Sequence, residues 1–270
     1  LAKTNHPVKV VFTAIFSFSV SVLQAQQLDS LMQAHEKNKE PEKVIASFKS
    51  SRLILSQTTT MVKKYNLDFK VIHRFGDIGG RDGGAPTFWG FDNSTDIYIG
   101  FDYGISDRFN IAFGRNKDEQ LLDLQLKYAL LQQNTDNSMP ISVGLIAKTG
   151  FKPYKVVNDV FDDYGNRFSY LGQAIISRKF SSNFSFQLAP TLLLRSKETI
   201  SPDDEETLFA LGAAGRYKFT KRFSLVGDYY WIASDYRNNN PSTNFYAPLG
   251  IGIEIETGGH VFTLNFVNSK

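Results

Sequence analysis

The chain has 270 residues, no cysteine and a formal net charge of +3. Without cysteine, disulfides, thiol chemistry and thiolate metal sites are excluded, and the small, mixed charge gives no reason to expect nucleic acid as a partner. Aromatic residues make up 14% of the chain, with 23 Phe and 12 Tyr, although the mean hydropathy is slightly negative. A membrane β-barrel accounts for this combination, because half of each strand faces lipid and half faces a polar lumen.

The N-terminal residues have the pattern of a secretory signal peptide. Lys3 and Lys9 precede an apolar run over 10–23, and Ala25 then supplies a small residue at a cleavage point. The run of about 14 residues is short for a membrane helix, which needs roughly 20. We predict a signal peptide over 1–25 and an exported chain whose membrane spans are β-strands. A signal anchor is the alternative.

Residues 26–60 come before the regular part of the chain. The polar stretch over 26–43 suggests a leader with a short helix ahead of Pro41. Residues 44–50 and 52–55 alternate only weakly, and as strands they are too short to cross a bilayer. We expect 26–60 to form a periplasmic leader or a plug inside the lumen. An extra edge strand from this region is the alternative.

From residue 67 onward, apolar and polar residues alternate, as in Leu67, Phe69 and Val71 against Asp68 and Lys70. Alternation with a period of two indicates strands that have one apolar and one polar face. Such segments lie near 67–75, 96–103, 109–113, 122–130, 141–147, 167–179, 184–195, 207–218, 223–232, 245–256 and 262–266.

Most of these segments run about 9–12 residues, close to the roughly 9–11 that cross a tilted bilayer span. Strands of a soluble β-sandwich, the alternative fold, are shorter, typically about 5–6 residues. The sequence therefore predicts an all-β fold, an antiparallel up-and-down transmembrane β-barrel over 61–270. Pro190 falls inside one segment, and we expect a bulge there because proline cannot donate to a strand ladder.

The connections between the predicted strands are alternately long and tight. Bacterial membrane barrels keep short turns on the periplasmic side and long loops outside, so we expect an outer-membrane protein of a Gram-negative bacterium with a periplasmic N-terminus. Three tight turns share a Ser or Thr, at Ser106, Ser181 and Thr220, which turn geometry explains. The long connections are 76–93, 150–166, 196–206 and 233–244, and the tight ones are 104–108, 180–183, 219–222 and 257–259.

The eleven predicted strands are an odd number, whereas single-chain bacterial barrels usually have an even one. We expect about 12 strands in the parent protein. Either the last strand lies beyond this sequence, or residues 44–55 supply the twelfth.

Several short blocks follow one another in a fixed order and carry a family resemblance. They are Ser47–Leu53, His73–Asp77, Gly90–Asn93, Asp102–Arg108, Gly114–Arg115, Leu126–Tyr128, Ala189–Thr191 and Glu256–Phe262. Together they resemble an uncharacterised family of predicted outer-membrane β-barrel proteins, known only as a domain of unknown function, over about residues 44–268. The resemblance implies a barrel, an outer-membrane location and a chain that continues past Asn268 into a final strand. It implies no activity.

The polar phase of the predicted strands carries many charged residues. If the apolar phase faces lipid, these side chains line the lumen. We expect an interior network of ion pairs that keeps the barrel closed, because an unpaired buried charge is costly. A narrow path for ions or a small solute is the alternative. The predicted lumen-lining residues are Asp68, Lys70, Arg74, Asp96, Asp102, Arg108, Asp123, Lys127, Arg195, Lys218, Asp228, Glu254 and Glu256.

Two histidines, His73 and His260, fall on the apolar phase and are expected at opposite rims, too far apart for a metal pair. We interpret both as packed beside interfacial aromatic residues. A lipid hydrolase on the outer face would need a serine within hydrogen-bond reach of His73. Asn93 and Thr95 begin the next strand nearby, but no serine is obviously in phase.

The remaining motifs point to loops. The glycine-rich stretch over 79–84 lacks the spacing of a nucleotide-binding loop, and the acidic stretches over 159–163 and 202–206 are interpreted as solvated, with a cation site as the alternative. We assign no catalytic, cofactor-binding or metal-binding residue. We predict a non-enzymatic barrel, structural, accessory or a narrow channel, in contact with outer-membrane lipid. The alternatives are a lipid hydrolase and a barrel that binds a protein partner through 150–166 and 233–244.

Overall fold

A computed structural model describes residues 30, 41–153, 164–195, 204–241 and 244–268. The chain divides into two compact units, 1–42 and 43–270, and the second contains all the features that follow. The predicted signal peptide lies outside the described residues. Within the described ranges, no helix has the length and apolar character to cross a membrane.

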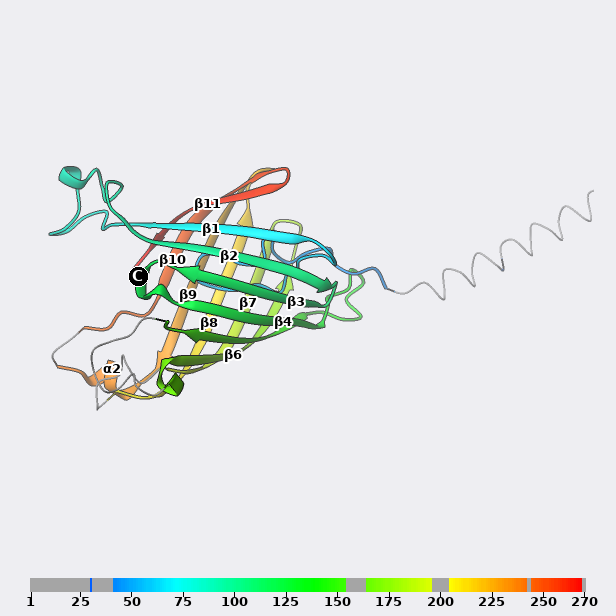
Figure 1. Ribbon diagram of the computed structural model, residues 1–270. Helices are drawn as coiled ribbons and strands as arrows, with labels where there is room; N and C mark the ends of the chain where they lie inside the picture. The colour runs from blue at the N-terminus through cyan, green and yellow to red at the C-terminus, as the bar shows by residue number, and fades with distance from the viewer. Residues whose placement is uncertain (1–29, 31–40, 154–163, 196–203, 242–243, 269–270) are drawn as a thin grey trace, which may run out of the picture. The chain divides into compact units, whose positions relative to one another are not determined.

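In the described part of the chain, eleven strands form one sheet, and each strand pairs antiparallel with the next along the chain (Figure 1). This up-and-down order and the all-β composition confirm the predicted fold class. The strands are β1 (Leu67–Phe75), β2 (Ser94–Ser106), β3 (Phe109–Asn116), β4 (Leu122–Leu131), β5 (Ser142–Phe151), β6 (Phe168–Lys179), β7 (Phe184–Leu194), β8 (Thr207–Lys218), β9 (Phe223–Ala233), β10 (Leu249–Thr257) and β11 (His260–Val267).

Side chains alternate between the two faces of the sheet, as the period-two pattern predicts. In β7 the burial alternates strictly from Phe184 to Ala189. On its outward phase, Phe186 and Leu188 are exposed, whereas Ser185 and Gln187 on the inward phase are buried. The exposed apolar and the buried polar side chains recur on most strands. The sheet is thus apolar outside and largely polar inside, the reverse of a soluble core.

The two ends of the sheet differ in their connections. At one end of the sheet, tight turns follow β2, β6, β8 and β10. The longer link from β4 to β5 lies at the same end. We call this end the short-turn side. The opposite end, the long-loop side, carries α2 (Figure 1). In the described part of the second unit, four short helices lie on connections of the long-loop side: η1 (Ala85–Thr87), η2 (Asp118–Gln120), η4 (Tyr164–Arg167) and α2 (Asp235–Asn239).

Hydroxyl side chains hold three of the tight turns. The Oγ of Ser181 accepts the N–H of Phe184 at 3.0 Å, and Oγ1 of Thr220 accepts the N–H of Phe223 at 2.9 Å. Ser106 Oγ accepts the N–H of the second residue after it at 3.2 Å. Ser181 and Thr220 also accept the N–H of the second residue after them, each at 3.2 Å, as in ST-turns. These bonds confirm that the shared Ser or Thr serves the turn.

Two local expectations were wrong. At Pro190 the register with both neighbouring strands runs through without a shift, so there is no bulge; the β6–β7 ladder instead has no paired residues between Gln173↔Thr191 and Ile176↔Leu188, where proline has no N–H to give. The tenth strand begins at Leu249, not near 245.

The two edge strands of the sheet each pair with one neighbour. Among the described strands β1 pairs with β2 and β11 pairs with β10, and the sheet does not close into a ring. Residues 44–55 do not form the weak strands suggested by their sequence, since only isolated bridges occur there, Arg52↔Gln57 and Lys43↔Asn134. They supply no additional strand.

Candidate functional site: the plugged lumen

Residues 43–62, which we call the plug, lie against the inward face of the sheet. Their apolar side chains Phe48, Leu53 and Ile54 are buried with Ala214 of β8 and Val226 of β9 in one cluster. Phe48 is 1% exposed. The lumen therefore has an apolar core that the plug and the wall build together.

Three wall side chains bind the plug on the side of β6, β7 and β9. Asp228 Oδ2 accepts the backbone N–H of Leu55 at 2.7 Å and that of Ser56 at 2.8 Å. The hydroxyls of Ser177 and Thr59 lie 2.6 Å apart, and Gln187 Nε2 donates to the carbonyl of plug residue 57 at 2.7 Å. Asp228 and Gln187 bind backbone groups of the plug, and Ser177 binds a plug hydroxyl, so these wall side chains hold the plug without a sheet ladder.

Lys127 anchors the plug on the opposite side. Its Nζ donates to the carbonyl of Thr60 at 2.7 Å and to that of Ser51 at 3.4 Å, and the residue is 2% exposed. Ser51 Oγ donates to Asp102 Oδ2 at 3.3 Å, and Lys70 forms an ion pair with the same carboxylate. The plug is thus tied into a network of buried charges between β1, β2 and β4.

A second ion-pair network lies on β8 and β10. Arg216 donates through Nε to Glu254 at 2.7 Å and through Nη2 to Glu256 at 2.5 Å. Lys218 and the plug residue Lys49 each lie 3.4 Å from Glu256. The pairing offsets the cost of placing these charges inside the sheet.

Inward-facing glycines make room for the chain and for aromatic rings. A Cβ on Gly104 would lie 2.2 Å from the carbonyl oxygen of Lys63, and one on Gly114 would lie 2.0 Å from the hydroxyl of Tyr98. The ring of Tyr98 in turn carries the guanidinium of Arg52, 5.7 Å from its centroid. A side chain at either glycine would displace the plug or the ring beneath it.

The structure places most of the predicted lumen residues on the inward phase. Asp96 accepts the N–H groups of Lys117 and Asp118 at 3.0 and 2.8 Å, and Asp123 pairs with Lys148 at 3.3 Å. The other residues on this phase are Asp68, Lys70, Arg74, Asp102, Lys127, Lys218, Asp228, Glu254 and Glu256.

Two of the predicted residues lie elsewhere. Arg108 is exposed in the turn that follows β2, because the strand ends at Ser106. Arg195 follows the last residue of β7 and pairs with Asp204 of the next loop. Arg195 was assigned to a strand that ends one residue earlier. Arg108 belongs to the tight turn over 104–108 that the sequence itself predicts, so its assignment to the lumen was wrong on that ground.

Sequence reasoning missed several inward residues with a role in the plug. Arg216 is in phase with Lys218 and could have been found by that spacing. Gln187 and Ser177 carry no charge, so alternation alone does not separate them from ordinary wall residues. Arg52 belongs to a segment without regular periodicity, and no sequence signal marks it.

A cavity of about 280 Å³ lies between the plug and the long-loop side. Arg52, Leu55 and Gln57 of the plug line it, together with Lys148 and Tyr230 of the wall. Its other lining residues come from β4 to β9 and from Pro248, and most are apolar. The lumen is therefore filled on the short-turn side of the cavity and hollow at the cavity itself.

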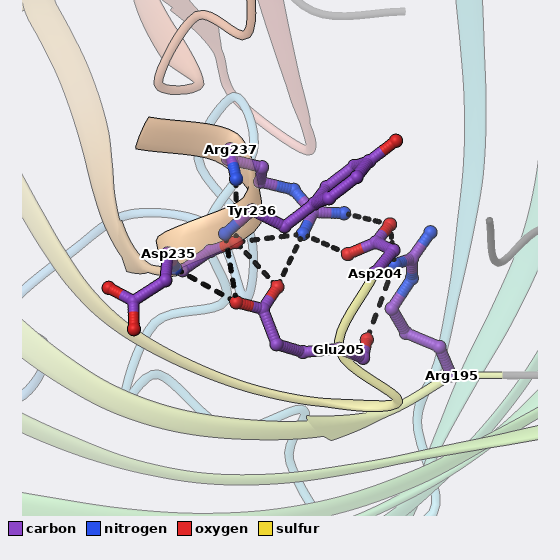
Figure 2. Close-up of polar contacts among 7 residues, drawn as sticks. Arg195, Asp204, Glu205, Asp235, Tyr236 and Arg237 are labelled. Atoms are coloured by element: carbon purple, nitrogen blue, oxygen red, sulfur yellow. Dashed lines mark hydrogen bonds and ion pairs between the residues drawn. The ribbon is translucent and has the colours of Figure 1, made fainter. Parts of the chain in front are cut away.

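A polar cluster joins two long connections outside the lumen (Figure 2). Asp204 lies between two guanidinium groups, with Arg195 at 2.5 Å and Arg237 at 2.7 Å. Glu205 accepts Ser234 Oγ at 2.6 Å and the N–H of the following residue, 235, at 2.8 Å. We call Arg195, Asp204, Glu205, Ser234 and Arg237 the loop cluster. It fixes the start of α2 against the connection between β7 and β8.

Hydrogen bonding keeps both carboxylates of the loop cluster ionised. Burial works against the ionisation of Asp204, but the hydrogen bonds from Arg237 and Arg195 outweigh it and hold its pKa below the usual value. The hydrogen bond from Ser234 lowers the pKa of Glu205, with backbone N–H groups adding to it. These two residues are therefore salt-bridged loop anchors. The acidic stretch over 159–163 lies outside the described residues.

The two histidines lie on the outward phase, each beside an aromatic ring. His73 stacks with Phe75 at 6.3 Å between ring centroids, and His260 with Phe262 at 6.0 Å. The Thr95 hydroxyl near His73 donates to the backbone carbonyls of residues 74 and 75. In the described part of the chain, no group of three or more His, Asp or Glu could hold a metal ion.

Comparison with known proteins places the chain in a family. The model of the membrane bound beta barrel domain family, DUF5777, matches residues 48–270. This range includes most of the plug and every strand of the sheet. No curated protein matches the chain. With the apolar outward face and the polar lumen described above, the match shows that the chain belongs to this family of membrane-bound β-barrels of unknown function.

Proposed function

We propose that the protein is a non-enzymatic membrane barrel whose lumen is closed by its own plug, acting as a structural or accessory protein and not as an open channel. The observation that carries the proposal is the set of buried wall side chains that bind plug backbone groups. Asp228 and Lys127 bind it from two sides of the lumen. A closed lumen of this kind gives a solute no continuous polar path.

Energetics support a plug that stays in place. A hydrogen bond to a charged group contributes about 1.5–3 kcal/mol, and Asp228 and Lys127 each make such bonds to the plug. Withdrawing the plug would also leave both groups without partners in a confined space and expose Phe48. An opening that costs this much would be rare.

The site of insertion supports an outer-membrane location with the N-terminus on the periplasmic side. Val44 N–H donates to the carbonyl of Gln133 at 2.8 Å, and this residue lies on the connection between β4 and β5, at the short-turn side. The plug thus begins where bacterial barrels face the periplasm. Protease protection of a tag inserted directly after the predicted signal peptide tests this orientation: the tag should be protected in intact cells and cleaved when the outer membrane is permeabilised.

Conductance in planar bilayers tests the closed lumen. The full chain should show no steady current, whereas Lys127→Met, which removes two bonds to the plug, should produce intermittent openings. Lys221→Met changes a lysine in an exposed turn and should behave like the unmodified protein. Steady single-channel currents from the unmodified protein would exclude a closed lumen.

The loop cluster favours partner binding as a second candidate function. It fixes two long connections in one arrangement through Arg237 and Asp204, and a fixed loop surface loses less conformational entropy on binding. Cross-linking in intact membranes should yield a specific product that Arg237→Gln diminishes. Absence of any product from the unmodified protein would remove this candidate.

A further inference from the structure

The cavity on the long-loop side of the plug has walls that depart from the polar character of the lumen. Ile146, Leu171, Leu193, Leu208 and Ile232 line it from five consecutive strands. All five lie on the inward phase. In the short-turn half of the same strands this phase mixes polar residues such as Gln187, Arg216 and Asp228 with the buried Ile175, Ala189, Ala214 and Val226. An apolar wall around a hollow space inside a polar lumen is suited to an apolar ligand.

The floor of the cavity is polar and positively charged. Arg52 and Lys148 both line it, and no Asp or Glu is among its lining residues. Lys148 is paired with Asp123. Arg52 forms no ion pair with a carboxylate within the described ranges; it rests on the Tyr98 ring and donates through Nε to the Ile54 carbonyl at 3.5 Å.

We propose that this cavity binds a small single-chain amphiphile, with its apolar tail between the leucine and isoleucine walls and an anionic head group on Arg52. A guanidinium suits a carboxylate or phosphate head group because its N–H donors match the oxygens of such a group. Gln173 and Tyr230, joined by a hydrogen bond of 3.4 Å at the same floor, supply further polar contacts. The inference rests on the closed lumen proposed above, since the plug provides the floor.

The size of the cavity limits the ligand. About 280 Å³ corresponds to about nine atoms at roughly 30 Å³ each, the share of a water molecule in the liquid. This volume is just below the roughly 300–1,000 Å³ typical of small-molecule sites. A medium-length acyl chain with one anionic group fits this limit, and a two-chain phospholipid does not.

Calorimetric titration of sodium octanoate into the full chain in zwitterionic nanodiscs tests the proposal. We expect one saturable site, with octanoate bound at least about tenfold more tightly than octylammonium. Leu193→Trp fills the cavity and should reduce binding at least about tenfold. Leu192→Trp, one residue away on the exposed face, is the matched control and should bind as before. In Arg52→Gln, the affinities for octanoate and octylammonium should become similar, because the guanidinium that favours the anion is gone.

A second measurement on the unmodified protein guards against a variant that does not fold. An octanoate analogue with a terminal photoreactive group should label peptides of β7 and β8 around Leu193 and Leu208, and excess octanoate should suppress the labelling. Three results would each overturn the proposal. The heat of titrating octanoate could equal that of empty nanodiscs, octylammonium could bind as tightly as octanoate, or the label could be confined to outward-facing residues. A conducting protein that still binds octanoate would overturn the closed lumen alone.

Discussion

The two halves of the lumen are built differently. Toward the short-turn side the plug fills the space, and each buried charge there has a partner, as with Arg216 and Glu254. Toward the long-loop side the wall is mostly apolar and borders a cavity. A barrel that needed only rigidity would gain from filling both halves, because packed interiors are favoured over voids. The difference suggests that the first half holds the structure and the second half is kept open for a ligand.

The largest effect is expected from the ion pair of the filled half. Arg216→Met leaves Glu254, which is 1% exposed, as an uncompensated buried charge and should lower the free energy of unfolding by about 3–5 kcal/mol. Denaturant unfolding in detergent or lipid measures it. Lys218→Gln removes a longer contact of 3.4 Å from a partly exposed side chain and should cost less than about 1 kcal/mol.

The double variant Arg216→Met/Glu254→Met separates charge from packing. Replacing both partners by apolar residues of similar volume is often neutral, so much of the loss should be recovered. If the double variant is as unstable as Arg216→Met alone, the loss comes from packing and not from an unpaired charge. Charge pairing would then not distinguish the filled half from the other.

The next prediction compares apolar side chains in the two halves directly. Phe48→Ala removes a fully buried ring from the plug cluster and should cost about 3–5 kcal/mol, because a new void forms in packed surroundings. Leu193→Ala only enlarges a cavity that already exists, so its cost should fall below the usual range of about 2–5 kcal/mol for such a change. Equal losses in the two unfolding curves would mean that the long-loop half is packed as tightly as the other.

The sequence predicted the strands well because their contacts are local and repeat with a period of two. In the segment 167–179 the alternation is broken, because Tyr170 and Leu171 are adjacent and both apolar. The structure gives the reason: Tyr170 is exposed outside, whereas Leu171 lines the cavity. An apolar residue that faces inward interrupts the alternation of apolar and polar residues, so the sequence alone does not show which face it occupies. The plug was harder still, since Ser51 meets Asp102 across 51 positions and such contacts leave no period in the sequence.

A glycine substitution gives an intermediate effect and tests how closely the wall is packed where Tyr98 supports Arg52 of the plug. Gly114→Ala places a Cβ 2.0 Å from the Tyr98 hydroxyl, so the ring must move and release the guanidinium of Arg52. Overpacking of this kind costs about 1–3 kcal/mol. Gly172→Ala is the control, because nothing lies within 4 Å of its added Cβ, and it should unfold like the unmodified protein. If the plug is cleaved faster by protease in Gly114→Ala than in the unmodified protein, then moving the Tyr98 ring loosens the plug.

The smallest effect concerns pH and the loop cluster, which lies outside both halves of the lumen. The folded pKa values of Asp204 and Glu205 are lowered, so their contribution to stability is present above the unfolded values of about 4 and is lost as pH falls through the folded values. Because the chain has no cysteine, a spin label at Asn239→Cys reports the end of α2 alone. The label should become mobile as the pH falls below about 4. With Arg237→Gln it should already be mobile at neutral pH, because the guanidinium that holds Asp204 is gone.

A label at Lys221→Cys, in a short turn, should not respond, since no carboxylate of the cluster touches that side of the barrel. If both labels respond alike, the acid effect is a loosening of the whole sheet, and the loop cluster is no independent unit.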